Sequence, residues 1–213
     1  MSSGTRRELW QKSRKSLGRF CSMSAMSKAR TRKDRSPESV FREEPPPYGV
    51  RKPVAVSLFS GCGGMDIGVE SAGFRTIACV ESDEHAVATL RLRAEREGGH
   101  TRVIHADIRT LNPLDVSSPG IALLHGGPPC QAFSLIGKRG SLDDERGLLL
   151  FEMIRFAKAL EPQAILMEQV KGLLSAPDQT GEPGAVFRKF TKQLGSLGYT
   201  VKWTVLCAAD YGV

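Results

Sequence analysis

Strands and helices are predicted to alternate from residue 54 onward, and this alternation limits the folds that the chain can form. Short apolar runs that end in glycine or in charged residues predict buried strands, and longer amphipathic patterns predict helices. The predicted strands are residues 54–60, 76–81, 103–105, 121–125, 164–168 and 199–207. The predicted helices are residues 65–72, 83–97, 147–160 and 185–197. Such an alternation predicts an α/β fold with a doubly wound, mainly parallel sheet.

The first 53 residues differ from the rest in charge and in pattern. Residues 1–53 contain 14 of the 30 basic residues but 5 of the 23 acidic ones, so their net charge is +9 and that of residues 54–213 is −2. They lack sustained apolar periodicity, which predicts a disordered basic tail ahead of one folded domain, residues 54–213. The tail could bind nucleic-acid phosphates without sequence preference or only aid solubility, and Met23 or Met26 could be the true start.

Cysteine usage and hydropathy exclude several classes of protein. The five cysteines lie far apart and no two form a CxxC pair. This pattern argues against a zinc site or a disulfide framework, so we expect no metal ligands and a reducing compartment. No apolar run approaches the roughly 20 residues that a membrane span needs, and no secretory signal follows the basic start, so no membrane partner is expected.

The most specific motif is Gly-Gly-Pro-Pro-Cys-Gln at residues 126–131, directly after a predicted buried strand. Open α/β sheets place their active sites at the carboxyl ends of strands, which is where Cys130 would lie. The two prolines restrict φ and remove backbone donors, so they would present the Cys130 thiol rigidly. A buried cysteine that only fills space is the ordinary alternative, but the motifs at the other strand ends favour a nucleophile.

A glycine-rich turn follows the first predicted strand. It contains Phe59, Gly61, Gly63 and Gly64, and its glycines would allow a tight turn and close approach of a ligand. The turn is not a dinucleotide fingerprint, because Asp66 stands where the third glycine should be and its charge would oppose a pyrophosphate. A nucleoside cofactor without phosphates therefore fits this turn better.

Acidic residues end three further predicted strands. Glu81, 20 residues after Gly61, could accept hydrogen bonds from ribose hydroxyls. Asp107 could accept from an adenine amine with Ile108 against the ring. Glu168 follows an apolar run, so partial desolvation would favour its protonated form and suit it to proton donation. The structural alternatives are solvated surface glutamates at 81 and 168 and a turn or N-cap aspartate at 107.

Taken together, these motifs resemble those of the cytosine carbon-5 DNA methyltransferases. The match covers residues 54–213 and includes the glycine turn, Glu81, Asp107, the Pro-Cys-Gln motif and Glu168, in the order of that family. The resemblance implies a class I, Rossmann-like methyltransferase fold, S-adenosylmethionine as cofactor, and DNA with a flipped cytosine as substrate. It also implies a restriction–modification methylase, located in the cytoplasm near the nucleoid in a bacterium or in the nucleus of a eukaryote.

The resemblance implies a role for each matched residue. Cys130 would be the nucleophile and Glu168 the proton donor. The residues implied in cofactor binding are Phe59, Gly61, Gly63, Gly64, Glu81, Asp107, Ile108 and Pro129. The residues of the following loop that would contact DNA are Gln131, Ser134, Lys138, Arg139 and Arg146.

Two departures from the family keep other interpretations open. Gln169 stands where family members usually have Asn, and its longer side chain could disturb the cysteine loop. The chain stops at Val213, before the family's Pro-Gln-x-Arg-x-Arg segment, target-recognition domain and final helix, so the sheet is expected to be incomplete at its C-terminal side. The chain could thus be one subunit of a split enzyme that needs a second polypeptide, or a truncated, non-catalytic remnant that binds cofactor or DNA. The tRNA-modifying member of the family is a further alternative, although its Cys-Phe-Thr tripeptide is absent.

Overall fold

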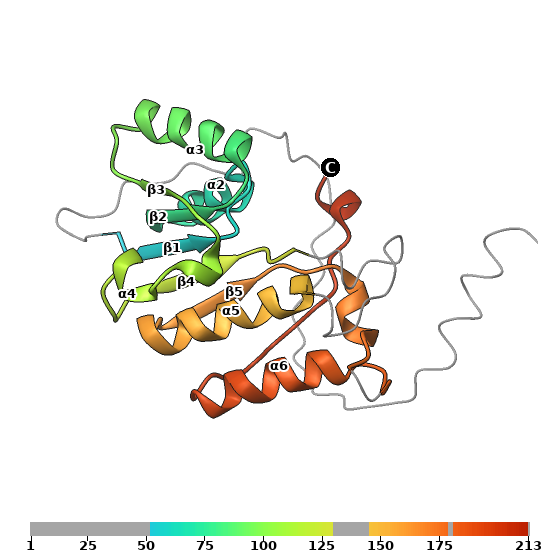
Figure 1. Ribbon diagram of the computed structural model, residues 1–213. Coiled ribbons are helices and arrows are strands. Elements are labelled where there is room, and N and C mark those ends of the chain that lie inside the picture. Colours follow the sequence, from blue (N-terminus) through green and yellow to red (C-terminus); the bar gives the residue numbers. More distant parts are fainter. Residues whose placement is uncertain (1–51, 130–144, 179–180, 213) are drawn as a thin grey trace, which may run out of the picture. The chain divides into compact units, whose positions relative to one another are not determined.

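A computed structural model describes residues 52–129, 145–178 and 181–212. Its centre is a parallel sheet of five strands in the order β3-β2-β1-β4-β5 (Figure 1). The strands are β1 (Val54–Leu58), β2 (Arg75–Glu81), β3 (Arg102–His105), β4 (Leu123–Gly126) and β5 (Ala164–Met167). The order reverses between β1 and β4, and open α/β sheets bind ligands at the carboxyl ends of strands beside such a point. The predicted basic tail lies outside the described residues, apart from Lys52 and Pro53.

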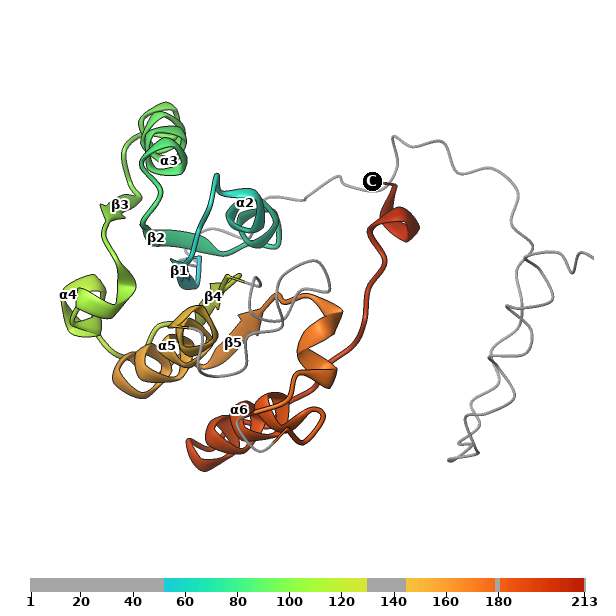
Figure 2. The ribbon, with the colours of Figure 1, turned by 45° about the vertical axis from the view of Figure 1, so that its right-hand side comes forward.

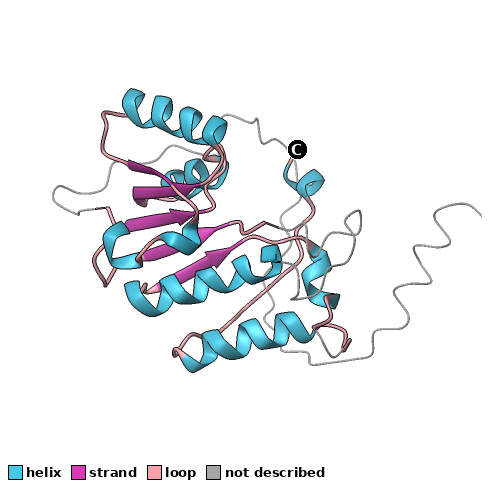
Figure 3. Ribbon diagram, viewed as in Figure 1, coloured by secondary structure: helices cyan, strands magenta, loops and turns pink. Residues whose placement is uncertain are grey.

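Helices cover both faces of this sheet, as Figures 2 and 3 show. The helices are α2 (Gly64–Ser71), α3 (Glu84–Arg96), α4 (Pro113–Val116), α5 (Glu145–Leu160) and α6 (Ala185–Ser196). Helices α2 and α3 lie on one face and α4 and α5 on the other, while α6 packs against α5 beyond β5. The predicted doubly wound α/β fold is therefore confirmed. None of the helices in the described ranges is long and apolar enough to cross a membrane.

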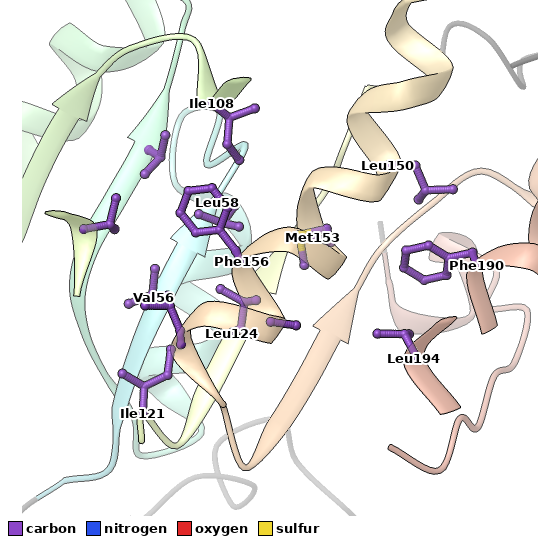
Figure 4. Close-up of a cluster of buried hydrophobic side chains, with 14 of the residues drawn as sticks. Val56, Leu58, Ile108, Ile121, Leu124, Leu150, Met153, Phe156, Phe190 and Leu194 are labelled. Atoms are coloured by element: carbon purple, nitrogen blue, oxygen red, sulfur yellow. The ribbon is translucent and has the colours of Figure 1, made fainter. Parts of the chain in front are cut away.

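The larger hydrophobic core lies between the sheet and α5 (Figure 4). Val56 and Leu58 of β1 and Leu124 of β4 meet Met153 and Phe156 of α5, and all five side chains are fully buried. Burial of such a side chain contributes roughly 1.5–3 kcal/mol. This core holds α5, the helix that follows the predicted cysteine loop, against the middle of the sheet.

The opposite face of the sheet carries a smaller apolar cluster and then a polar row. Ala55, Val69 and Leu123 form the cluster beneath α2. Two residues further along the strands, Ser57 is in register with Cys79 of β2 and His125 of β4. Side chains alternate between faces along a strand, so this row shares the α2 face with Ala55.

The predicted sixth strand at residues 199–207 is wrong for this chain. The structure assigns no strand there, and residues 201–212 are all exposed. A strand forms by hydrogen bonding to a neighbouring strand, and in the described sheet no strand pairs with the outer side of β5. Trp203 instead packs edge-on against Phe187 of α6, with ring centroids 5.8 Å apart.

Four short elements were not predicted. They are α4 and the 3₁₀ helices η3 (Ile108–Thr110), η4 (Lys171–Ser175) and η5 (Ala208–Tyr211). Each spans three to five residues, which is too short for an amphipathic pattern to be recognised. Two of them, η3 and η4, directly follow the Asp107 and Glu168 regions and so help to shape the strand-end site.

The carboxyl ends of β1 and β4 approach each other unusually closely. Leu58 and Gly126 are paired in register. A β-carbon placed on Gly126 would lie 2.2 Å from the carbonyl oxygen of Leu58, a distance that no real contact allows. Position 126 therefore requires glycine for steric reasons.

We expect Gly126→Ala to lower the free energy of unfolding by about 3 kcal/mol, because the added methyl group must push two central strands apart. Urea denaturation of the full chain measures this change. Gly68→Ala is the matched control, since a β-carbon there has no neighbour within 4 Å. That helical substitution should be neutral or stabilising by up to about 1 kcal/mol. Equal effects of the two substitutions would contradict the steric explanation.

Candidate active site at the carboxyl ends of the strands

The glycine-rich turn after β1 has the conformation that its sequence predicted. Phe59, Gly61 and Gly63 have positive φ angles of 54°, 53° and 87°, and Gly63 is the N-cap of α2. Phe59 is the exception among them, because a side chain with a positive φ is unfavourable. The buried Ser60 supports the turn: its backbone N–H donates to the Val80 carbonyl at 3.2 Å and its hydroxyl lies 2.8 Å from that of Ser57.

Glu81 joins the end of β2 to this turn. One oxygen of its carboxylate accepts the Gly61 backbone N–H at 2.8 Å. The other accepts the backbone N–H groups of Ser82 at 2.7 Å and Asp83 at 2.9 Å. A carboxylate has about four acceptor positions, so Glu81 can hold the turn and still accept a further hydrogen bond. The 20-residue spacing that suggested a ribose partner thus also reflects a structural contact.

Asp107 ends the loop after β3 and pairs with Arg109. The guanidinium contacts the carboxylate with a shortest separation of 2.6 Å, and the Arg109 backbone N–H donates to it at 3.0 Å. These hydrogen bonds to Arg109 hold the pKa of Asp107 below its usual range. Asp107 is therefore the N-cap of η3, which the sequence analysis gave as the structural alternative. It is also an ionised acceptor at the mouth of a cavity.

A cavity of about 140 Å³ opens beside these residues. The residues predicted to bind a cofactor that line it are Phe59, Glu81, Asp107, Ile108 and Pro129. Gly61, Gly63 and Gly64 shape the adjacent turn and are not among its lining residues. The prediction missed Ser82, Arg109 and Leu149, which also line the cavity. Ser82 and Arg109 are direct neighbours of predicted residues, whereas nothing in the local sequence distinguishes Leu149 from the other leucines of α5.

Glu168 lies at the end of β5, beside the start of the predicted cysteine loop. Its backbone N–H donates to the Gly126 carbonyl at 3.1 Å. A β-carbon on Gly127 would lie 3.3 Å from a Glu168 carboxylate oxygen, so the side chain faces that loop. Glu168 is exposed, however, and the predicted partial desolvation is wrong for the ligand-free chain. Among the described residues, no strand lies beyond β5 to cover this position.

Gln169 connects the end of β5 to the same loop. Its side-chain amide donates to the Pro128 carbonyl at 3.0 Å and accepts the Val170 backbone N–H at 2.8 Å. The expected disturbance of the cysteine loop by the longer side chain is therefore not observed at Pro128.

Several predicted site residues cannot be placed. Cys130, Gln131, Ser134, Lys138 and Arg139 lie outside the described residues. Arg146 belongs to α5, but its side chain is not described. The described site thus contains Pro129 and the residues before it, together with Glu168 and Gln169 at the end of β5.

Asp66 was expected to face the ligand at the glycine turn, and the structure places it elsewhere. It is fully buried beneath α2, where one carboxylate oxygen accepts a hydrogen bond from the Cys79 thiol at 3.2 Å. Burial and this neighbouring carboxylate raise the pKa of Cys79 far above its usual value, so that thiol stays protonated. The Asp66 carboxylate thus lies between α2 and the sheet and does not line the cavity. Its charge is therefore no evidence against a phosphate group in the cavity.

His125 is the second ionisable group buried on this face. It is fully buried, and neither ring nitrogen has a hydrogen-bond partner among the described residues. Burial lowers the pKa of His125, and the nearby charge of Asp66 opposes that shift. The neutral imidazole is one residue before the Gly-Gly-Pro-Pro-Cys motif, so it lies behind the active-site loop.

Comparison with known proteins identifies the family. Residues 54–213 match the C-5 cytosine-specific DNA methylase family. The chain is 39% identical over 173 residues to the type II methyltransferase M.AquIA of Picosynechococcus sp., covering 74% of this chain and 66% of that protein. It is 39% identical over 158 residues to M.NgoPII of Neisseria gonorrhoeae, covering 74% of this chain and 43% of that protein.

A solved structure agrees with the sequence relatives. The chain superimposes with a TM-score of 0.53 and 28% identity on the crystal structure of a DNA modification methyltransferase encoded within an E. coli prophage, covering 67% of this chain and 38% of that one. The strand order and the strand-end site define a Rossmann-like methyltransferase domain. The chain belongs to the C-5 cytosine-specific DNA methylase family, and it spans two thirds or less of the length of these relatives.

We expect the free energy of unfolding of the chain to decrease as the pH falls, because His125 is buried. Its pKa is lowered in the folded state, so the unfolded chain binds the proton first and acid favours unfolding. As the pH falls from about 7.5 to 5.5, around the ordinary histidine pKa near 6.5, the free energy of unfolding should decline more steeply than in His125→Gln. The difference in slope should reach at most about 1.4 kcal/mol per pH unit.

Urea denaturation across this pH range measures the slope. The matched control is His85→Gln, because the His85 side chain is 89% exposed. That substitution should leave the slope unchanged. Identical slopes for the native chain and His125→Gln would show that the imidazole is not held neutral by folding.

Proposed function

We propose that this chain forms the cofactor-binding and catalytic part of a DNA cytosine-5 methyltransferase of the restriction–modification type. The observation that carries the proposal is the meeting of five strand ends at one edge of the sheet. The glycine turn, Glu81, Asp107, Pro129 and Glu168 follow β1, β2, β3, β4 and β5 in the family's order. The relatives M.AquIA and M.NgoPII are type II methyltransferases.

The residues around the cavity fit S-adenosylmethionine. Phe59, Ile108 and Leu149 offer apolar surface for an adenine ring. The side-chain oxygens of Asp107 and Glu81 offer hydrogen-bond acceptors for an amine and for hydroxyl groups. Neither a phosphate-binding lysine nor an arginine projects from the glycine turn, which fits a nucleoside without phosphates. When bound, the cofactor would supply an electrophilic methyl group beside Pro129 and the cysteine that follows it.

In the proposed reaction Cys130 activates the target base. Its thiolate would add to carbon 6 of a flipped cytosine, while Glu168 donates a hydrogen bond or a proton at ring nitrogen 3. Carbon 5 would then be nucleophilic and take the methyl group, with S-adenosylhomocysteine as the leaving group. Loss of the carbon 5 proton to water and of the Cys130 thiolate would restore the ring. The base must leave the duplex for this chemistry.

Gln169 supports the loop that carries the nucleophile. By holding the Pro128 carbonyl, it links the residue after the proton donor to the residues before Cys130. In this proposal Gln169 performs the orienting function of the asparagine that is usual in the family. The substitution is thus compatible with a catalytic chain.

We further propose that a second polypeptide supplies target recognition and covers the β5 edge. Leu166 of β5 is 48% exposed, and Trp203, Val205 and Leu206 are more than half exposed. An apolar cavity of about 390 Å³ lies between β5, α6 and residues 198–203. An exposed strand edge beside apolar side chains favours the addition of a strand. The basic tail would add salt-dependent, sequence-independent affinity for DNA.

Binding of S-adenosylmethionine tests the cofactor site directly. We expect Glu81→Ala and Asp107→Ala each to raise Kd by about tenfold to a hundredfold, because each removes a hydrogen bond from a charged acceptor. Isothermal titration calorimetry on the full chain measures both. Asp115→Ala, an exposed carboxylate in α4, is the control and should bind like the native chain. Unchanged affinity in both cavity variants would overturn the assignment.

Covalent trapping tests the chemistry. DNA containing 5-fluorocytosine should form a denaturation-resistant adduct in the presence of cofactor, because fluorine blocks the final elimination. Cys130→Ser should abolish the adduct, whereas Cys79→Ser should not, since the Cys79 thiol is buried and protonated. An adduct that survives Cys130→Ser would refute the role of Cys130.

A methylation assay on duplex DNA tests the need for a partner. Alone, the chain should methylate duplex DNA negligibly, and addition of a polypeptide bearing a recognition domain should restore methylation of one defined site. Rapid, site-specific methylation by the purified chain alone would refute the second polypeptide. Cofactor binding without any methylation under either condition would favour the non-catalytic alternative.

A further inference from the structure

Arg155 of α5 forms hydrogen bonds to a neighbouring segment of the chain. Its guanidinium donates to the backbone carbonyl of Ile108 at 2.7 Å and to that of Leu111 at 2.8 Å. It also pairs with Glu152, one turn earlier in α5, at 2.5 Å. Its Cζ lies 4.9 Å from the ring centroid of the buried Phe156. Four contacts therefore fix this side chain, although 36% of it remains exposed.

One of the two carbonyls that Arg155 holds belongs to Ile108, which lines the proposed cofactor cavity, and the other belongs to the turn that Ile108 begins. Ile108 begins η3 and is buried against the cavity, and Leu111 is the C-cap of the same turn. Asp107 fixes the start of η3 by accepting the Arg109 N–H, and Arg155 fixes its end. Leu149, six residues before Arg155 in α5, forms part of the same cavity. Arg155 thus joins the two elements between which the cavity opens, without lining it.

We propose that Arg155 is a positioning residue that sets the width of the nucleoside end of the cofactor cavity. Its planar guanidinium can bond to two carbonyls and a carboxylate at once, and lysine, with one nitrogen, cannot reproduce this geometry. Without it, η3 would be held to α5 only by apolar packing, and Ile108 would no longer be fixed relative to Leu149. The inference rests on the proposed cofactor site and adds a residue that the ligand itself does not touch.

The test compares two ligands on the full chain by isothermal titration calorimetry. S-adenosylmethionine carries the nucleoside and the amino acid, and 5′-methylthioadenosine carries the nucleoside alone. Arg155→Met should raise Kd for both ligands by the same factor, about tenfold, because the affected wall contacts their shared part. Arg155→Lys should raise it by only about threefold, since one hydrogen bond can be restored. Lys158→Met, an exposed cation on the same helix, should bind like the native chain.

Each other outcome counts against the inference or against the proposed function on which it rests. Native affinity in Arg155→Met and Arg155→Lys overturns it, as does a loss confined to S-adenosylmethionine or an equal loss in Lys158→Met. Circular dichroism checks that each variant folds. If Arg155→Met does not fold, the roughly threefold rise in Kd expected for both ligands in Arg155→Lys tests the inference. Failure of the native chain to bind either ligand would instead overturn the proposed function, and the positioning role with it.

Discussion

The absence of a side chain at Gly126 is the constraint on which the site depends. It lets β4 end against the Leu58 carbonyl of β1, at the point where the strand order reverses. Every residue of the candidate site is placed relative to these two strand ends. The glycine turn leaves β1 here, the Pro-Pro-Cys motif leaves β4, and Glu168 is tied to β4 through the Gly126 carbonyl. A wider spacing would separate the glycine turn from Pro128 and Pro129.

The polar and charged side chains of the site also hold its backbone together. Glu81 accepts three backbone N–H groups, Asp107 caps η3, and Gln169 binds the Pro128 carbonyl. Arg155 completes this set from outside the cavity. Because these groups are already oriented by the protein, a ligand would meet acceptors that need little further ordering, which reduces the entropic cost of binding.

Much of this arrangement could be predicted from local patterns, and particular residues show where such prediction ends. The strands and the turn at residues 59–64 were recognisable because apolar periodicity and glycine preferences act over a few residues. The burial of Asp66 in α2 was not predictable, because it depends on Cys79, 13 residues away on β2. The exposure of Glu168 and the lack of a strand at 199–207 were not predictable either, because both depend on which strands pair, and no described strand pairs with the outer side of β5.

The sequence by itself determined which residue types follow each strand, and hence the family and the chemistry that its members share. These are properties of short segments, and they do not depend on how the segments are arranged. The tertiary structure alone decided which groups meet: His125 buried with Asp66, Gln169 at Pro128, and Arg155 at the carbonyls of η3, 44 and 47 residues earlier. The physical reason is that hydrogen bonding and burial act through distance in space, and strand order sets that distance.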